Sequence, residues 1–261
     1  MGEIAKKKQR KSFVIKRKKR KALKRNIIIF IFLIIILITL SLKLKVFGIE
    51  NIIVKGNNII SSEEIIRMST LEKGKNIFYI NSKNIIKKTH DNPYIKNVKI
   101  SRKLPNTIIL SVEERSAFFY GENNNKYFII DKESKLLQIK DEIANMNLIY
   151  VEGLDYNNAK VGNEMLPKED RKSKILQQFS FLIENNISGI DITSLDIKDV
   201  LFIKVYHNNM CIIIGTSDGI EEKLNKAINI ICSKPKLSQS KGYINVSFKG
   251  HPVIFVEEVI E

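Results

Sequence analysis

The spacing of hydrophobic and polar residues divides the chain into segments of different kinds, and one of them is uniformly apolar. Residues 26–42 carry no charge, and the run extended to Phe47 covers 21 residues from Ile27. As a helix it would span roughly 31 Å at about 1.5 Å per residue, which matches a hydrocarbon core of about 30 Å. A buried core helix fits less well, because protein cores rarely need a helix so uniformly apolar. A cleaved signal peptide fits less well, because residues 43–47 offer no small residues for cleavage. The pattern predicts a retained transmembrane helix at 26–47.

The segment after the apolar run combines strand and helix periods. A strand is predicted at 49–55, and Ser61 followed three residues later by Glu64 forms a capping box that opens a helix. A second short helix is predicted to begin at Asn81 or Ser82. Two helices can cover only one face of a small sheet, so this part is predicted as one compact module.

A β-hairpin is predicted to complete this module. Val98 and Ile100 alternate with polar residues, and the same alternation recurs over residues 108–112. Pro105 and Asn106 supply the turn, because proline fixes φ and lacks the donor that a strand would need. The predicted order is therefore strand, helix, helix, strand, strand.

The rest of the chain is mostly strand-like. Short alternating runs are separated by polar turns, and amphipathic helices are predicted at about 168–185 and 219–232. The predicted strands lie at 118–120, 127–130, 136–137, 148–151, 190–197, 200–206, 210–215, 242–248 and 252–258. This pattern indicates a β-rich module with two helices.

Charge is concentrated at one end and sets the expected topology. Residues 1–25 hold 13 of the 44 Lys and Arg residues, and Glu3 is their only acid. By the positive-inside rule the tail stays in the cytoplasm, and the chain after the span lies outside the cell membrane. Attraction to anionic lipid is the favoured further role of the tail, ahead of binding to a cytosolic protein partner or to nucleic acid. Phe13 is the sole aromatic residue of the tail, so the tail offers no stacking platform for nucleic-acid bases.

Together these patterns predict an α+β protein in four parts. They are a basic cytoplasmic tail at 1–25, a transmembrane helix at 26–47, a β-α-α-β-β module at 48–116 and a β-rich module at 117–261.

Candidate catalytic chemistry is sparse. His90, His207 and His251 lack metal-ligand spacing, so no metal site is expected. Two Ser-x-x-Lys sequences, at Ser233 and Ser238, are expected by chance in a chain this rich in serine and lysine, and no companion motif accompanies them. Glycines are scattered singly, so the sequence has no phosphate-binding glycine loop. Neither a cofactor nor a small-molecule substrate is expected. An enzyme is not expected.

The two cysteines allow more than one arrangement. Cys211 and Cys232 both lie in the part expected outside the membrane, where a disulfide is chemically allowed. Both are flanked by isoleucines, which favours buried free thiols over a bridge.

The last strand pair offers a candidate binding surface. Residues 242–255 alternate well over Ile244, Val246 and Phe248. At a sheet edge the unpaired backbone groups of such a strand would recruit a strand from another protein, whereas a central strand would have none to offer. Alternation alone leaves both arrangements open.

The order of these features resembles the FtsQ/DivIB family of bacterial cell-division proteins over nearly the whole chain. The most specific part follows the second helix and covers the hairpin. The resembling residues are Asn92-Pro93-Tyr94-Ile95, Val98-x-Ile100-x-Arg102-x-x-Pro105-x-Thr107 and Val112-x-Glu114-Arg115, with Val54-x-Gly56-Asn57, Gly74-x-Asn76-Ile77-Phe78 and Phe128-Ile129-Ile130-Asp131 through Leu136 as further landmarks.

The resemblance implies a POTRA-type domain at 48–116 and a noncatalytic, single-pass (type II) scaffold of the divisome at the septum. It implies recruitment of FtsB/DivIC-like and FtsL-like partners during septum formation, by strand addition at the last β-module strand. The residues implied to bind the partner are Tyr243, Ile244, Asn245, Val246, Ser247, Phe248 and Gly250. Asn245 and Ser247 stand where the family often has Asp and Arg, so a charged contact there is not implied. The alternatives are a POTRA-bearing secretion or assembly factor and a membrane-anchored cell-wall enzyme.

Overall fold

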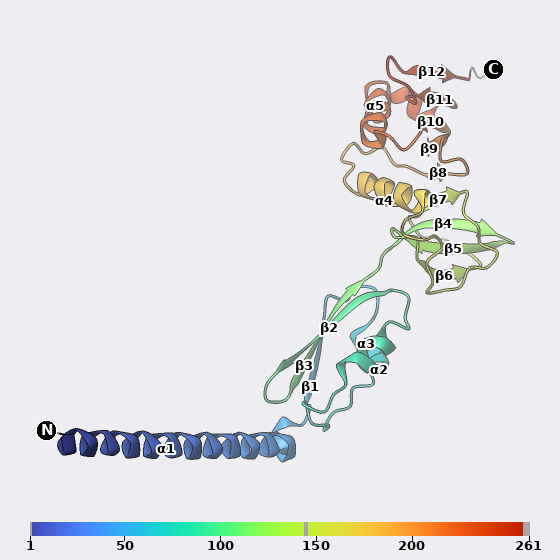
Figure 1. Ribbon diagram of the computed structural model, residues 1–261. Helices are drawn as coiled ribbons and strands as arrows, with labels where there is room; N and C mark the ends of the chain where they lie inside the picture. The colour runs from blue at the N-terminus through green and yellow to red at the C-terminus, as the bar shows by residue number, and fades with distance from the viewer. Residues whose placement is uncertain (1, 144–145, 258–261) are drawn as a thin grey trace. The chain divides into compact units, whose positions relative to one another are not determined.

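The computed structural model describes residues 2–143 and 146–257 of the chain (Figure 1). The chain divides into two compact units. The first unit contains the residues up to Lys55 together with Ser61–Ile86 and Lys99–Ser111. The second contains Gly56–Ile60, Lys87–Val98 and the residues from Val112 onward.

A single long helix begins the chain. α1 (Gly2–Lys43) includes both the basic tail and the apolar run. Within it, Leu23–Lys43 is long and apolar enough to cross a membrane. The helix ends at Lys43, and the remaining residues of the predicted span form the 3-10 helix η1 (Lys45–Phe47) after Leu44.

A three-stranded sheet with two short helices follows, in the predicted order. Its strand order is β1-β3-β2, with β1 parallel to the central strand β3. The side chain of Ser61 accepts a hydrogen bond from the backbone N–H of Glu64 at 3.2 Å, which confirms Ser61 as the helix cap, and the Glu64 carboxylate pairs with Arg67 at 3.8 Å. The elements are β1 (Asn51–Lys55), α2 (Ser62–Ser69), α3 (Ser82–Thr89), β2 (Ile95–Lys103) and β3 (Thr107–Glu114).

The loop after β1 is held by one carboxylate. Gly56 adopts a φ of +83°, and a Cβ there would lie 2.3 Å from the carbonyl oxygen of Val112, so the close approach of the two strands requires glycine. The Glu114 carboxylate then accepts hydrogen bonds from three successive backbone N–H groups, those of residues 58, 59 and 60, at 2.9, 2.6 and 3.0 Å. The close approach of Gly56 to Val112 explains the glycine of the sequence pattern, and the three hydrogen bonds of Glu114 explain the glutamate.

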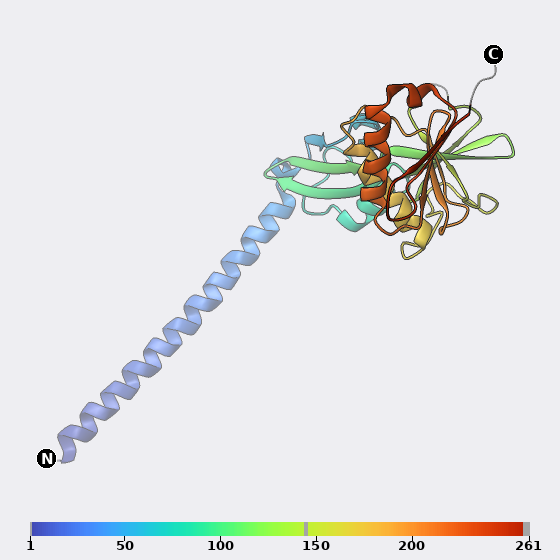
Figure 2. The same cartoon turned by 90° about the horizontal axis from the view of Figure 1, so that it is seen from above.

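A nine-stranded sheet forms the carboxyl-terminal part. Its order is β12-β11-β10-β9-β8-β7-β4-β5-β6, so β12 and β6 are its edges. Isoleucine, valine and leucine side chains of the strands share one hydrophobic core with residues of α4 and α5. Figure 2 shows the ribbon of the same strands and helices from above. The elements are β4 (Ala117–Asn123), β5 (Lys126–Asp131), β6 (Leu136–Lys140), β7 (Ile149–Glu152), α4 (Arg171–Glu184), β8 (Ser194–Asp196), β9 (Ile203–His207), β10 (Met210–Gly215), α5 (Ile220–Ser233), the 3-10 helix η2 (Pro235–Gln239), β11 (Gly242–Asn245) and β12 (Val253–Val256). The predicted α+β fold, with a β-rich part that carries two helices, is confirmed.

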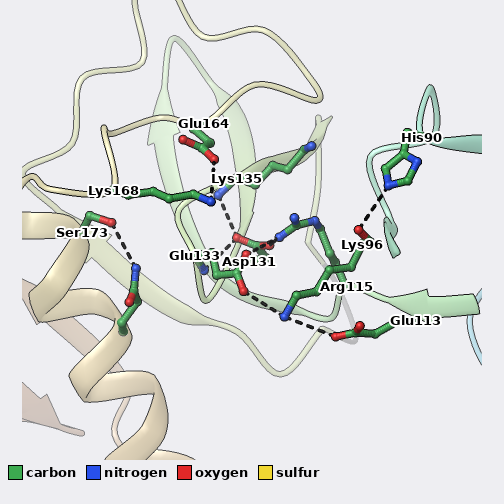
Figure 3. A network of polar contacts seen from close by, with 11 residues as sticks. His90, Lys96, Glu113, Arg115, Asp131, Glu133, Lys135, Glu164, Lys168 and Ser173 are labelled. Carbon is green, nitrogen blue, oxygen red and sulfur yellow. Dashed lines mark hydrogen bonds and ion pairs between the residues drawn. The ribbon is translucent and has the colours of Figure 1, made fainter. Parts of the chain in front are cut away.

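An ionic network lies within the second unit (Figure 3). The Arg115 guanidinium donates to the carboxylates of Asp131 and Glu133, and Lys96 pairs with Glu133 at 2.9 Å and with Glu113 at 3.3 Å. Asp131 is nearly buried, and it also accepts the backbone N–H groups of the turn that follows β5. Two residues of the family pattern, Arg115 and Asp131, are therefore bound to each other.

Both cysteines are free. Cys211 on β10 is half-buried, whereas Cys232 at the end of α5 is exposed. The prediction of a buried thiol is therefore wrong for Cys232. The inner side of α5 includes Ile228 and Ile231, and a step of about 100° per residue turns the next side chain away from the core.

Candidate partner-binding edge

The strand expected to bind a partner lies inside the sheet. β11 runs parallel to β10 on one side and antiparallel to β12 on the other. Of the residues implied by the resemblance, Tyr243, Ile244 and Asn245 belong to β11, and the others follow it in a loop. The alternation in the sequence did not decide between an edge strand and a central strand, and in the structure β11 is a central strand. The edge of the sheet belongs to β12.

β12 presents unpaired backbone groups at this edge. The N–H of Glu257 donates to the carbonyl of Lys241 at 2.8 Å, and the β11–β12 register pairs Phe255 with Tyr243. Because N–H groups alternate between the two sides of a strand, those of Ile254 and Val256 point away from β11. In the described part of the chain no further strand lies beyond β12. Such an edge is a template for a strand from another protein.

The two faces of this strand pair differ. Ile244 and Val246 are buried, and Ile254 packs against the same core. On the opposite face the rings of Tyr243 and Phe255 stack with 5.4 Å between their centroids. Phe255 remains 48% exposed, so an apolar surface lies directly beside the edge that β12 presents.

The loop between β11 and β12 is built by local hydrogen bonds. The Asn245 carboxamide oxygen accepts from the backbone N–H and the hydroxyl of Ser247, at 3.0 and 2.7 Å, and this turn ends β11. Lys226 on α5 donates to the carbonyl of Gly250 at 2.6 Å. Asn245 and Ser247 are thus engaged with each other, which agrees with the absence of the charged pair that the family often carries there.

A pocket lies between this loop and the start of α5. Its volume is about 600 Å³. Phe248 is one of its lining residues and is 46% exposed, so its ring is available for contact. The other lining residues are Asp218, Gly219, Glu222, Lys223, Lys226, Val246, Ser247, Lys249 and Gly250. The loop residues implied by the resemblance therefore meet at one place, next to the edge strand.

Three of the polar side chains considered as catalytic candidates, those of His207, Ser233 and Ser238, make hydrogen bonds within the fold. Buried His207 contacts the backbone oxygen of Asp191 and the hydroxyl of Ser238, at 2.6 and 2.5 Å. Ser233 donates to the carbonyl of Ile230 in the last turn of α5. Among the residues that the structure describes, the hydroxyl groups of Ser233 and Ser238 are therefore bonded to groups other than the lysine of their Ser-x-x-Lys sequence.

Sequence reasoning missed the residues that form the edge. It predicted a strand near 252–258, which β12 confirms in part, but it assigned partner binding to the preceding strand. In β12, Val253, Phe255 and Val256 are exposed and Ile254 is half-buried. All four residues are apolar, so the sequence of this strand has no polar alternation that would have shown which face is exposed.

Comparison with known proteins identifies the family. The family model described as POTRA domain, FtsQ-type, matches residues 47–115. The chain is 46% identical to the cell division protein DivIB of Clostridium botulinum strain Hall over 242 residues, which cover 93% of this chain and 94% of that protein. It is 46% identical over 218 residues to DivIB of Clostridium acetobutylicum, covering 83% and 86%, and 27% identical over 208 residues to DivIB of Bacillus subtilis strain 168, covering 78% and 73%. The chain therefore belongs to the DivIB/FtsQ family of cell division proteins.

Proposed function

We propose that the chain is a noncatalytic, single-pass scaffold of the division machinery that recruits a partner by strand addition at β12. The partner class is the extracytoplasmic segment of an FtsB/DivIC-like protein, with an FtsL-like protein in the same assembly. The observation that carries the proposal is the edge of the nine-stranded sheet, where Ile254 and Val256 direct N–H groups outward beside the exposed ring of Phe255. Family membership supports the division role.

The proposed binding site combines backbone and side chains. Backbone groups of β12 would pair with the incoming strand, which gives affinity without requiring a particular sequence. The stacked rings of Tyr243 and Phe255 and the ring of Phe248 would supply apolar contacts on either side of that strand. Aromatic rings contribute a large contact area and are typical of the residues that dominate an interface.

The proposed topology follows from charge and length. The basic tail keeps the amino terminus in the cytoplasm, and Leu23–Lys43 crosses the membrane. Both sheets then lie outside, at the septum. Anionic lipid near the tail would add to the anchoring.

A backbone-specific substitution tests the proposal. Val256→Pro removes an N–H that points outward and leaves the β11–β12 hydrogen bonds in place, whereas Val256→Ala keeps that N–H and removes only the side chain. With the full chain in nanodiscs and the partner's extracytoplasmic segment as ligand, we expect Val256→Pro to weaken binding about tenfold or more and Val256→Ala to weaken it little.

Thermal melts accompany both variants, so that a loss of fold is separated from a loss of the edge. Equal binding by the proline variant and the wild-type chain, with both folded, would exclude strand addition at β12.

In cells, depletion of the protein should give filaments with unfinished septa, and normal septation after depletion would exclude the division role.

A further inference from the structure

Three segments near the end of the apolar helix form one surface that combines exposed apolar side chains with basic ones. The segments are residues 43–50, residues 72–79 and the β2–β3 turn at residues 102–106. We infer that this surface, here called the membrane-proximal patch, docks on the anionic headgroups of the bilayer that α1 crosses. This is a second membrane contact, made by the folded module in addition to the span.

Hydrogen bonds fix the second segment at the end of the span. The side-chain amide of Asn76 donates to the carbonyl oxygens of Ser41 and Leu42, at 3.0 and 3.1 Å. Those residues lie in the last turn of Leu23–Lys43, whose 21 residues span roughly 31 Å, about the thickness of the hydrocarbon core. When the span fills that core, Ser41 and Leu42 lie at its boundary and Asn76 lies at the depth of the headgroups.

Backbone contacts bind the first segment to the second. The N–H of Ile77 donates to the carbonyl of Phe47 at 2.8 Å, and the rings of Phe47 and Phe78 lie 5.4 Å apart. Phe47 is four residues beyond the end of α1, so it lies within about 14 Å of Lys43 even in a fully extended chain. The segment at residues 72–79 therefore cannot move away from the membrane surface while these contacts hold.

The β2–β3 turn belongs to the same surface. The Arg102 side chain donates to the carbonyl of Ile77 at 2.9 Å, and the carbonyl of Asn106 accepts from the N–H of Glu50 at 2.9 Å. Leu104, at the tip of this turn, is 56% exposed. The hairpin thus adds an apolar tip beside the two membrane-adjacent segments.

The composition of the patch matches a bilayer interface. Tyr79 is 67% exposed, and tyrosine is enriched where an apolar ring meets the headgroups. The other exposed apolar side chains are Leu44, Val46, Phe78 and Leu104. The basic side chains are Lys43, Lys45, Lys73, Lys75, Arg102 and Lys103.

Only two carboxylates oppose these six basic residues in the three segments, those of Glu50 and Glu72. Glu72 pairs with Lys75 at 3.0 Å, and Glu50 accepts from the amide of Asn106. The excess of positive charge favours anionic headgroups over a zwitterionic surface or an acidic segment of the same chain. Long lysine stems can also lie along the acyl boundary while their ammonium groups stay in water.

The absence of tryptophan from the sequence allows a sharp test. Tyr79→Trp and Leu104→Trp each place a single fluorophore on the patch, and Phe202→Trp places one at a site that is 47% exposed in the other unit. The full chain is reconstituted in lipid vesicles that contain a shallow spin-labelled quenching lipid, with or without anionic lipid. We expect emission from the two patch variants to be quenched and shifted to the blue with anionic lipid, and emission from Phe202→Trp to be unchanged.

Reversal of two lysine charges on the patch distinguishes electrostatic docking of the patch from simple anchoring by the membrane span. Lys73→Glu with Lys103→Glu, in the Tyr79→Trp background, should reduce the docked-to-undocked ratio by about fivefold or more for each lysine replaced. Lys126→Glu with Lys234→Glu makes the same change of charge at exposed sites outside the patch and should have no effect. Quenching that is equal in all these variants and in both lipid compositions, or no stronger than that of Phe202→Trp, would overturn the inference.

Discussion

The rings of Tyr243 and Phe255 are stacked, with 5.4 Å between their centroids and 24° between their planes. The pair joins an internal strand, β11, to the edge strand, β12. A partner strand that adds to β12 would therefore lie beside the Phe255 ring, and that ring is held in place by its contact with Tyr243 on β11. Such a supported ring loses little conformational freedom on binding, which favours it as an anchor.

Phe248 tests the side-chain part of the proposed interface. Its ring is 46% exposed and lines the pocket beside the loop, so Phe248→Glu should leave the melting temperature within a few degrees of that of the wild-type chain. We expect partner binding, measured by titration calorimetry, to weaken about tenfold or more, because apolar contact is replaced by a charge. Phe202→Glu, at an exposed phenylalanine remote in sequence, is the matched control. Unchanged binding by a folded Phe248→Glu variant would remove this residue from the interface.

Glu114 should stabilise the fold far more than its neighbour Glu113. Glu114→Ala leaves three backbone N–H groups of the loop at residues 58–60 without their carboxylate, and we expect it to lower the free energy of unfolding by about 1–3 kcal/mol. Glu113 makes one ion pair, with Lys96, and is 57% exposed, so Glu113→Ala should cost about 0.5 kcal/mol or less. Urea denaturation of both variants checks this, and equal losses would contradict the assigned role of Glu114.

Acid should destabilise the chain in part through Glu133. Its hydrogen bond with Lys96, followed by that with Arg115, holds the pKa of this carboxyl below its ordinary value of 4.5. A carboxyl whose pKa is lower in the folded state stabilises the fold above its unfolded pKa, and this contribution is lost as the pH falls through the folded pKa.

Glu133→Gln should therefore lower the melting temperature at neutral pH and reduce the further drop on going below about pH 4. Glu122→Gln, at an exposed position in β4, should leave the pH dependence unchanged. A pH profile of Glu133→Gln that parallels the wild-type profile would show that the pairs with Lys96 and Arg115 contribute nothing to stability.

The two cysteines should report both burial and topology. Burial raises the pKa of the Cys211 thiol, whereas Cys232 is exposed, so a maleimide should modify Cys232 about tenfold faster or more in the folded chain. A membrane-impermeant maleimide should also label Cys232 in intact cells, and Cys232→Ser should abolish that rapid labelling. Labelling that requires cell lysis would place this part of the chain in the cytoplasm and contradict the proposed topology.

Local signals in the sequence were sufficient for much of the fold. The Ser61–Glu64 cap and the hairpin around Pro105 and Asn106 are set by residues a few positions apart, and both were predicted. The predicted ends of helices and strands were less accurate, because hydrogen bonds from particular side chains decide where each element begins and ends. Asp170 caps α4, which begins at Arg171, and the Asn245–Ser247 turn ends β11 earlier than its alternation indicates.

The edge of the sheet could not be predicted in this way. β10 and β11 pair in parallel, with α5 between them in sequence, so the neighbours of β11 depend on long-range pairing. Alternation over Ile244 and Val246 is the same for a central strand and an edge strand, since it reports only which face is buried. The interaction of Arg115 with Asp131 is long-range in the same sense, although both residues belong to the family pattern.

The most direct test of the account is amide hydrogen exchange at the edge strand, measured with and without the partner's extracytoplasmic segment. In the free protein the amides of Ile254 and Val256 should exchange fast and that of Phe255 slowly, because only the last is paired with β11. On binding, the amides of Ile254 and Val256 should become protected. A partner that binds while both amides still exchange at their free rates would contradict strand addition at β12.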